Sequence, residues 1–143
     1  MGALSELVKR HYANVAAADV EGDRKLMHPD LVTIDPGAGR IEGVEGFLQY
    51  EQGFHQAFPD GRMEMKSYVE SGSTIVSEGA FIGTHTGPLV GPAGTVPPTG
   101  KALRLDFCDV FEVVDGRIKE HRIYYDQVSF LAQLGLMASP AAS

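Results

Sequence analysis

The chain has 143 residues, of which 43% are hydrophobic and 22% are charged, and its formal net charge is −7. These proportions are those of an ordinary globular domain and argue against a disordered chain. The negative charge, with no Lys/Arg run longer than two residues, disfavours nucleic acids and anionic membrane surfaces as partners. No apolar stretch approaches the roughly 20 residues that span a bilayer, and the N-terminus lacks the apolar core of a signal peptide, so we expect a cytoplasmic protein.

The first part of the chain carries helical periodicity. Apolar residues recur at intervals of three and four positions, which predicts amphipathic helices. The predicted helices cover residues 4–18, 23–27 and 43–58. Pro29 is expected to stop the second helix and Pro59-Asp60-Gly61 the third, because proline disfavours a helical residue before it. A short β-type run over residues 31–34 lies between these two helices.

Predicted strands dominate the rest of the chain. They cover residues 62–69, 74–86, 102–114 and 117–125. Asp115-Gly116 predicts a two-residue hairpin turn between the last two, because both turn positions favour residues that tolerate φ > 0. Residues 87–100 hold four Gly and four Pro, which excludes a helix or a central strand and predicts a long connection between two antiparallel strands. A closing helix over 127–136 and a flexible tail over 137–143 complete the prediction of a single domain, residues 1–136.

Helices followed by hairpin-linked strands are the pattern of an α+β fold. A long sheet must cover one of its faces, and three helices are available to do so. The space between these two layers is then either filled core or a pocket.

The strand over residues 103–113 is the most informative one. Side chains alternate between the two faces of a strand, so its apolar odd positions should face the interior. Asp109 is the only charged residue among the odd positions. Burial of a carboxylate without partners is costly, and a carboxyl group in a cavity is suited to act as a general acid or base. The alternative is a structural hydrogen bond to a neighbouring strand, a helix N-terminus or a buried tyrosine.

The paired strand places His121, Ile123 and Tyr125 on one face. Pairing counted from the hairpin turn sets Asp109 near Arg122, unless a β-bulge shifts the register. His121 is therefore either an acid or base in the cavity or a solvated strand residue.

Other polar residues have two readings each. Tyr12 either presents its hydroxyl to a cavity or packs in the core with one hydrogen bond. His85, beside the Gly/Pro-rich segment, either contacts a ligand at a pocket mouth or is exposed. The remaining residues of this kind are expected to be solvated (His11, His28 and His55) or to be a small strand residue (Cys108).

Several classes of site find no support in the sequence. No set of His, Cys, Asp or Glu has metal-ligand spacing, and no Gly-x-Ser-x-Gly elbow occurs. The Gly-rich segments lack a P-loop lysine and a βαβ context. We therefore expect no metal and no cofactor, which leaves cofactor-free acid/base chemistry or plain binding.

Short segments, taken in order along the chain, resemble those of one family. They are His28-Pro29-Asp30, Ala57-Phe58-Pro59-Asp60, Gly83-Thr84-His85-Thr86-Gly87, Pro97-Pro98-Thr99-Gly100, the run over residues 114–122, Tyr125-Asp126 and Gln133-Leu134-Gly135. By their order and spacing the chain resembles the SnoaL-like polyketide cyclases, within the nuclear-transport-factor-like proteins that include ketosteroid isomerases and limonene epoxide hydrolases. The resemblance implies a cone-shaped α+β barrel, in which a curved mixed or antiparallel sheet wraps around N-terminal helices. It also implies a homodimer and a pocket that needs no cofactor.

The resemblance further implies intramolecular aldol chemistry on a polyketide ester, with an Asp on the last strand taking and returning a proton. Counted from Asp115-Gly116, that Asp falls where Ile123 stands, and a family cyclase has a pocket His at the place of Asp109. We hypothesise that the ionisable group has moved across the hairpin while keeping the same cavity. Asp126 is interpreted as the cap of the closing helix.

The sequence-based hypothesis is therefore a cofactor-independent acid/base enzyme acting on an apolar small molecule, with Asp109 and His121 as catalytic residues. The residues expected to contact the ligand are Tyr12, Phe54, His85, Phe107, Phe111, Ile123 and Tyr125. The alternatives are a binding domain that kept the pocket and lost the catalytic Asp, an epoxide hydrolase-like enzyme, and a dimerising module with a filled interior.

Overall fold

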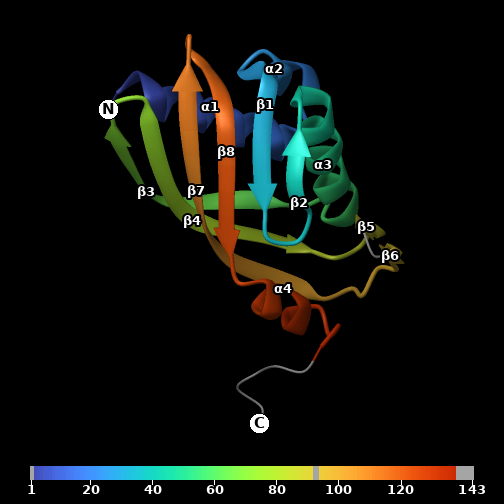
Figure 1. The fold of residues 1–143 in the computed structure, drawn as a ribbon. Helices are drawn as coiled ribbons and strands as arrows, with labels where there is room; N and C mark the ends of the chain where they lie inside the picture. The colour runs from blue at the N-terminus through green and yellow to red at the C-terminus, as the bar shows by residue number, and fades with distance from the viewer. Residues whose placement is uncertain (1, 92–93, 138–143) are drawn as a thin grey trace.

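The computed structural model describes residues 2–91 and 94–137. A curved six-stranded sheet in the order β2-β1-β8-β7-β4-β3 forms one layer, and two helices cover one of its faces (Figure 1). The helices are α1 (Ala3–Ala17), α2 (Val20–Arg24), α3 (Val44–Ala57) and α4 (Gln127–Gln133). The strands of this sheet are β1 (Met27–Asp35), β2 (Gly39–Glu42), β3 (Arg62–Ser71), β4 (Thr74–Thr84), β7 (Ala102–Val114) and β8 (Arg117–Tyr125). The expected α+β class is confirmed, and the sheet is mixed because β1 and β8 run parallel while the other neighbours are antiparallel.

The two long helices cover different ends of the sheet. Helix α1 packs against β3 and β4, whereas α3 packs against β1 and β2. The short α4 follows β8 and contacts β7 near the lower end of the sheet in Figure 1. Among the described residues, no helix is both long enough and apolar enough to cross a membrane.

The second helix lies earlier than predicted. It covers Val20–Arg24 rather than residues 23–27, because the Asp19 side chain caps it by accepting a hydrogen bond from the Gly22 N–H. Met27 already begins β1, which runs through Pro29 to Asp35. Proline is tolerated there because the pairing of β1 with β8 is interrupted between Met27 and Val32, so no ladder hydrogen bond is lost.

Three short strands, β2, β5 (Leu89–Gly91) and β6 (Gly94–Val96), were absent from the sequence prediction. Strand β2 follows a turn in which the Asp35 carboxylate accepts hydrogen bonds from the N–H groups of Gly37 and Ala38, at 2.8 and 2.7 Å. The Gly/Pro-rich connection is not structureless, because β5 and β6 pair within it as a separate two-stranded sheet. The closing helix is shorter than predicted, and the predicted tail lies outside the described residues from position 138 onward.

The Gly/Pro-rich connection begins where its backbone packs directly against the backbone at the C-terminus of α3. The N–H groups of Thr86 and Gly87 both donate to the Ala57 carbonyl at 3.1 Å, which ties the connection to the C-terminus of α3. A Cβ on Gly87 would collide with the Gln56 carbonyl oxygen. We therefore expect Gly87→Ala to lower the free energy of unfolding by about 3 kcal/mol, since backbone cannot move aside as a flexible side chain does. Urea denaturation measures this, and Gly53→Ala, where nothing lies within 4 Å of the added Cβ, is the matched control.

A β-bulge in the β7–β8 hairpin sets the face of every side chain beyond it. Val113 pairs with Ile118, but Glu112 pairs with Glu120, so Lys119 is left without a partner in β7. Beyond the bulge Asp109 lies opposite Ile123. The register predicted by counting from the hairpin turn, which set Asp109 near Arg122, is therefore wrong by one residue. Because one residue of slip exchanges the two faces of a strand, the bulge brings His121 to the buried face.

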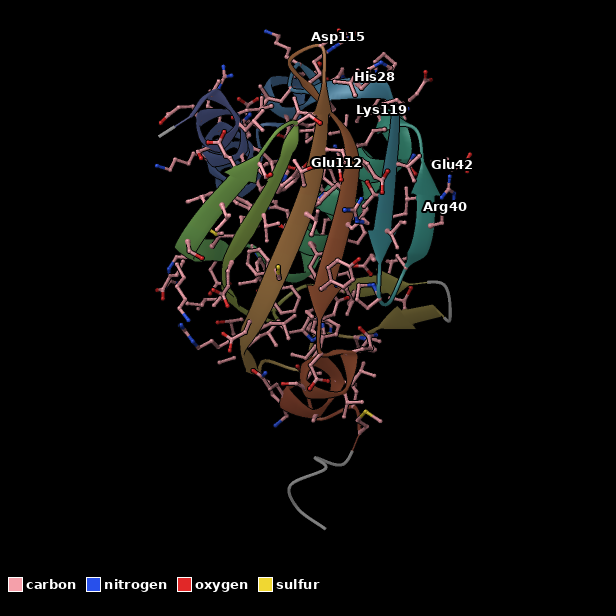
Figure 2. All side chains as sticks on the ribbon, turned by 60° about the vertical axis from the view of Figure 1, so that its left-hand side comes forward. His28, Arg40, Glu42, Glu112, Asp115 and Lys119 are labelled. Carbon is pink, nitrogen blue, oxygen red and sulfur yellow. The ribbon has the colours of Figure 1, made fainter. Side chains whose placement is uncertain are left out.

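The opposite face of this hairpin is polar and more exposed. Figure 2 shows Asp115 at the tip of the hairpin and Glu112 further down β7. The Glu112 carboxylate pairs with the Arg122 guanidinium at 3.1 Å and accepts a hydrogen bond from Thr74 at 2.5 Å. Arg40 and Glu42 form a further ion pair on the edge strand β2, at 2.9 Å. The alternation predicted for β7 is therefore confirmed.

The apolar interior consists of two clusters. The larger one lies between α1, α3 and the sheet and includes Leu7, Phe47, Ile75 and Phe111. The smaller one joins the end of α3 to β7 and α4 and is built on Phe58, Leu103 and Phe130. Side chains at the border of both clusters line a cavity.

Candidate active site

The cavity has a volume of about 100 Å³ and lies between α1, α3 and strands β3, β4, β7 and β8. Most of its wall is aromatic or aliphatic. The aliphatic and phenylalanine side chains of the wall are Val15, Phe47, Phe54, Met63, Phe81, Leu105, Phe107 and Ile123. The side chains that carry polar groups are His11, Tyr12, Tyr50, Glu51, Asp109, His121 and Tyr125. An apolar cavity with a few convergent polar groups is the usual form of a small-molecule site.

Asp109 is 4% exposed, and only one of its two carboxylate oxygens accepts a hydrogen bond. Its Oδ2 accepts a hydrogen bond from the Tyr12 hydroxyl at 2.6 Å. Its Oδ1 lies 3.3 Å from His121 Nε2 but accepts no hydrogen bond from any described residue. One carboxylate oxygen is thereby held in place while the other remains available to a ligand.

The Tyr12 hydroxyl has two hydrogen-bond partners, so this side chain does more than pack in the apolar core. Its hydroxyl lies 2.5 Å from the Ser77 hydroxyl on β4 in addition to its bond to Asp109. Burial and the negative charge of Asp109 raise the pKa of Tyr12 well above its ordinary value. The phenol therefore stays protonated and donates to Asp109 at any physiological pH.

His121 is held by rings rather than by hydrogen bonds. Its imidazole stacks on Phe111 at a centroid separation of 4.4 Å and meets Phe47 edge-on at 5.5 Å. Neither ring nitrogen has a hydrogen-bond partner among the described residues. His121 Nε2 instead lies 3.3 Å from Asp109 Oδ1, which places the imidazole beside the carboxylate in the cavity wall.

A buried chain of three polar side chains joins the three N-terminal helices. His11 on α1 is buried, contrary to its expected solvation, and its Nδ1 lies 2.9 and 3.0 Å from the two oxygens of Asp23 on α2. Burial opposes ionisation of Asp23, but the charge and hydrogen bond of His11 and a hydrogen bond from Glu51 outweigh it and lower the pKa of Asp23. Burial and the hydrogen bond to Asp23 raise the pKa of Glu51, on α3, to about 9. Glu51 is therefore a neutral acid near pH 7, beside the ionised Asp23.

A second carboxylate holds two cavity phenols from behind. Asp35 at the end of β1 accepts hydrogen bonds from the hydroxyls of Tyr50 and Tyr125, at 2.6 and 3.3 Å. Burial and the Asp35 charge raise the pKa of Tyr50 well above its ordinary value, and they raise that of Tyr125 too. Both rings are fixed with their faces available as cavity wall.

Five of the seven residues predicted to contact a ligand line the cavity, and both predicted catalytic residues do. Those five are Tyr12, Phe54, Phe107, Ile123 and Tyr125. Phe111 instead stacks behind His121. His85 lies away from the cavity, fully buried against Phe58 at a centroid separation of 5.4 Å. Sequence reasoning missed His11, Asp23 and Glu51, since their shared network depends on helix packing.

His85 anchors the Gly/Pro-rich connection. Its Nδ1 accepts a hydrogen bond from the Thr99 N–H at 3.2 Å, and the Thr99 hydroxyl lies 3.0 Å away. We expect His85→Ala to lower the free energy of unfolding by about 1–3 kcal/mol, because a half-buried backbone donor loses its acceptor and a fully buried ring is removed. Ligand affinity should stay within threefold, because His85 lies outside the cavity. Thermal unfolding and ligand titration measure the two effects, with exposed His55→Ala as control. A large loss of affinity at unchanged stability would contradict this role.

Comparison with known proteins places the chain in one family. The family model described as SnoaL-like polyketide cyclase matches residues 6–134. The chain belongs to the SnoaL-like polyketide cyclase family. No group of three or more His, Cys, Asp or Glu in residues 2–91 and 94–137 is arranged to hold a metal ion.

Individual relatives agree with this membership. Aklanonic acid methyl ester cyclase DnrD of Streptomyces peucetius is 27% identical over 135 residues, which cover 91% of this chain and 89% of that protein. Nogalonic acid methyl ester cyclase of Streptomyces nogalater is 29% identical over 115 residues, covering 78% and 81%. The crystal structure of IdmH from Streptomyces antibioticus is 32% identical and has a TM-score of 0.77, covering 92% of this chain and 97% of that one. A SnoaL-like protein from Jannaschia sp. CCS1, 22% identical, shares the fold with a TM-score of 0.82, covering 95% and 92%.

Proposed function

We propose that this protein is an enzyme that closes a ring in a polyketide-type ester by proton transfer, without a cofactor, and that Asp109 is its acid/base. The observation that carries the proposal is the position of Asp109. Its free Oδ1 lies in an apolar cavity, and its cross-strand partner is Ile123, where the family resemblance expects the catalytic Asp. Side chains directly opposite each other across an antiparallel pair have Cβ atoms about 4.5–5.5 Å apart, so a carboxylate at either place reaches the same ligand atoms.

The reaction that fits this geometry is an intramolecular aldol addition. Asp109 takes a proton from a carbon next to one carbonyl, which leaves an enolate. The enolate carbon attacks a second carbonyl of the same molecule, forming a C–C bond while the C=O π electrons move to oxygen. That oxygen is then protonated to a hydroxyl, so the product is an isomer of the substrate. A carboxylate in an apolar site is suited to the first step because little water competes for it.

The size of the cavity limits which part of a ligand it holds. A volume of about 100 Å³ is smaller than the roughly 300–1,000 Å³ typical of pockets that enclose a whole drug-sized ligand. We propose that the reacting end of the ester enters the cavity.

The test uses the esters on which the relatives are named. Aklanonic acid methyl ester and nogalonic acid methyl ester are incubated with the protein in D₂O, and products are separated by chromatography and weighed by mass spectrometry. A ring-closed isomer that forms only with the protein supports the proposal, as does protein-dependent deuterium in the unreacted ester at the carbon next to its carbonyl, where the enolate has been reprotonated. Recovery of both esters without deuterium would contradict it for these substrates.

A non-catalytic binding domain is the second candidate, favoured by Ile123 at the place of the family's catalytic Asp. It predicts that an ester binds and is recovered unaltered. Calorimetric binding without deuterium incorporation separates this candidate from the enzyme.

A further inference from the structure

The cavity wall includes a second histidine, His11, that the chemistry of Asp109 does not use and whose carboxylate partner, Asp23, lies outside the cavity lining. His11 and His121 both line the cavity, and each is paired with an aspartate, Asp23 and Asp109. The two imidazoles meet edge-on with centroids 5.7 Å apart. One cavity therefore holds two acid/base groups on different elements, α1 and the β7–β8 hairpin.

We propose that His11 is a second catalytic residue, which protonates the oxygen formed on ring closure while Asp109 removes the carbon-bound proton. This inference rests on the proposed function and extends it to the other half of the reaction. It requires a substrate with two carbonyl groups on one apolar skeleton, one next to the carbon that loses its proton and one that accepts the new bond.

The orientation of His11 supports this role. Its Nδ1 faces both oxygens of Asp23 at 2.9 and 3.0 Å, so Nε2 lies on the opposite edge of the ring. His11 is 2% exposed and Asp23 is fully buried, so the pair is shielded from bulk water. A buried carboxylate stabilises an imidazolium far better than solvent-exposed pairs do. Asp23 is thus a positioning residue, which fixes the ring by its two contacts with Nδ1.

Glu51 completes the arrangement from α3. Its two buried oxygens have no hydrogen-bond partner among the described residues. Burial and the neighbouring Asp23 raise its pKa to about 9, so Glu51 adds no charge beside Asp23 at neutral pH. An ionised Glu51 would place a second negative charge beside Asp23.

The protons balance over one turnover. Asp109 gains the proton from carbon, and His11 loses its Nε2 proton to the new alkoxide, which becomes a hydroxyl. Asp109 and His11 then differ from their starting states by one proton. Exchange with solvent after the product leaves returns both residues to their starting states.

The test separates proton removal from ring closure by using His11→Asn. The amide nitrogen of Asn stands near the place of Nδ1 and can still donate to Asp23, but it cannot transfer a proton. With aklanonic acid methyl ester in D₂O, we expect ring closure to fall at least about 100-fold. Deuterium incorporation into the unreacted ester should stay within threefold, because Asp109 is intact. His55→Asn, at an exposed position on α3, is the control for both rates.

Each outcome decides the point. Ring closure within threefold of the unaltered protein, or equal loss of closure and of deuterium incorporation, would overturn the role of His11. If the proposed function itself is wrong, the unaltered protein will catalyse neither ring closure nor deuterium incorporation into the ester. That result would also overturn the role proposed for His11. Asp23→Asn is the second variant and should show the same split between the two rates. Imidazole added to His11→Gly should restore closure in a saturable way, which a purely structural His11 would not allow.

Discussion

Replacing Asp109 with Asn is expected to lower kcat roughly 10²–10⁴-fold, the usual contribution of a positioned general acid or base. The amide oxygen can still accept the Tyr12 hydroxyl, which reaches Asp109 at 2.6 Å in the unaltered protein. Fold and ligand affinity should therefore be retained while proton transfer is lost. Deuterium incorporation and ring closure in aklanonic acid methyl ester should fall together, because the first step fails.

The matched control is Asp106→Asn on the same strand. Asp106 is exposed on the opposite face of β7, so its replacement should leave turnover within threefold. Turnover of Asp109→Asn close to that of the unaltered protein would contradict the assignment. The double variant Asp109→Asn/Ile123→Asp carries the test further, since it returns a carboxylate to the cross-strand position. We expect it to recover at least about tenfold over Asp109→Asn, because both positions face one cavity.

Glu51 is expected to make the protein less stable as pH rises from about 5 to about 9. Its pKa is raised from 4.5 to about 9 in the folded protein. Over that range the unfolded chain releases the Glu51 proton and the folded protein keeps it, so increasing pH favours unfolding. The slope from one such group is about 1.4 kcal/mol per pH unit.

Glu51→Gln isolates this effect. The Gln amide has the size and neutrality of the protonated acid, but it does not titrate. The difference in unfolding free energy between Glu51→Gln and the unaltered protein should therefore grow in favour of the variant by about 2–3 kcal/mol from pH 6 to pH 8. Asp23 does not cancel the effect, because its lowered pKa confines its own contribution to pH values below about 4, where stability falls with decreasing pH.

Urea denaturation at both pH values measures the difference. Glu45→Gln is the control on the same helix, because the Glu45 side chain is 67% exposed and pairs with Arg24 at the surface. Its difference from the unaltered protein should stay constant with pH. A constant difference for Glu51→Gln would show that Glu51 ionises normally in the folded protein.

Local pattern accounts for what sequence reasoning predicted correctly. The strands over residues 102–114 and 117–125 and the helix over 43–58 follow from periodicity and turn residues, and the structure places them within a residue of those bounds. Strict alternation in β7 was enough to put Asp109 on the buried face. The family resemblance was carried by short segments in a fixed order, and the matched family model confirms it.

Tertiary packing decided what the pattern left open. The bulge at Lys119 breaks the alternation of β8, so only the paired structure shows that Asp109 meets Ile123 and not Arg122. The sequence predicted that Pro29 follows the end of a helix, but Pro29 lies within β1. It is accommodated there because β8 does not pair with that part of β1.

The buried polar network is the clearest case of dependence on the whole fold. His11, Asp23 and Glu51 come from three helices and resemble ordinary polar positions of amphipathic segments, because local spacing records which face is apolar but not what packs across from it. The sequence by itself determined the fold class, the family and one buried carboxylate. Only the packing of α1, α2 and α3 against one another determined that a buried histidine–carboxylate pair, His11 and Asp23, lies beside this cavity, since a buried charge finds its partner through space and not along the chain.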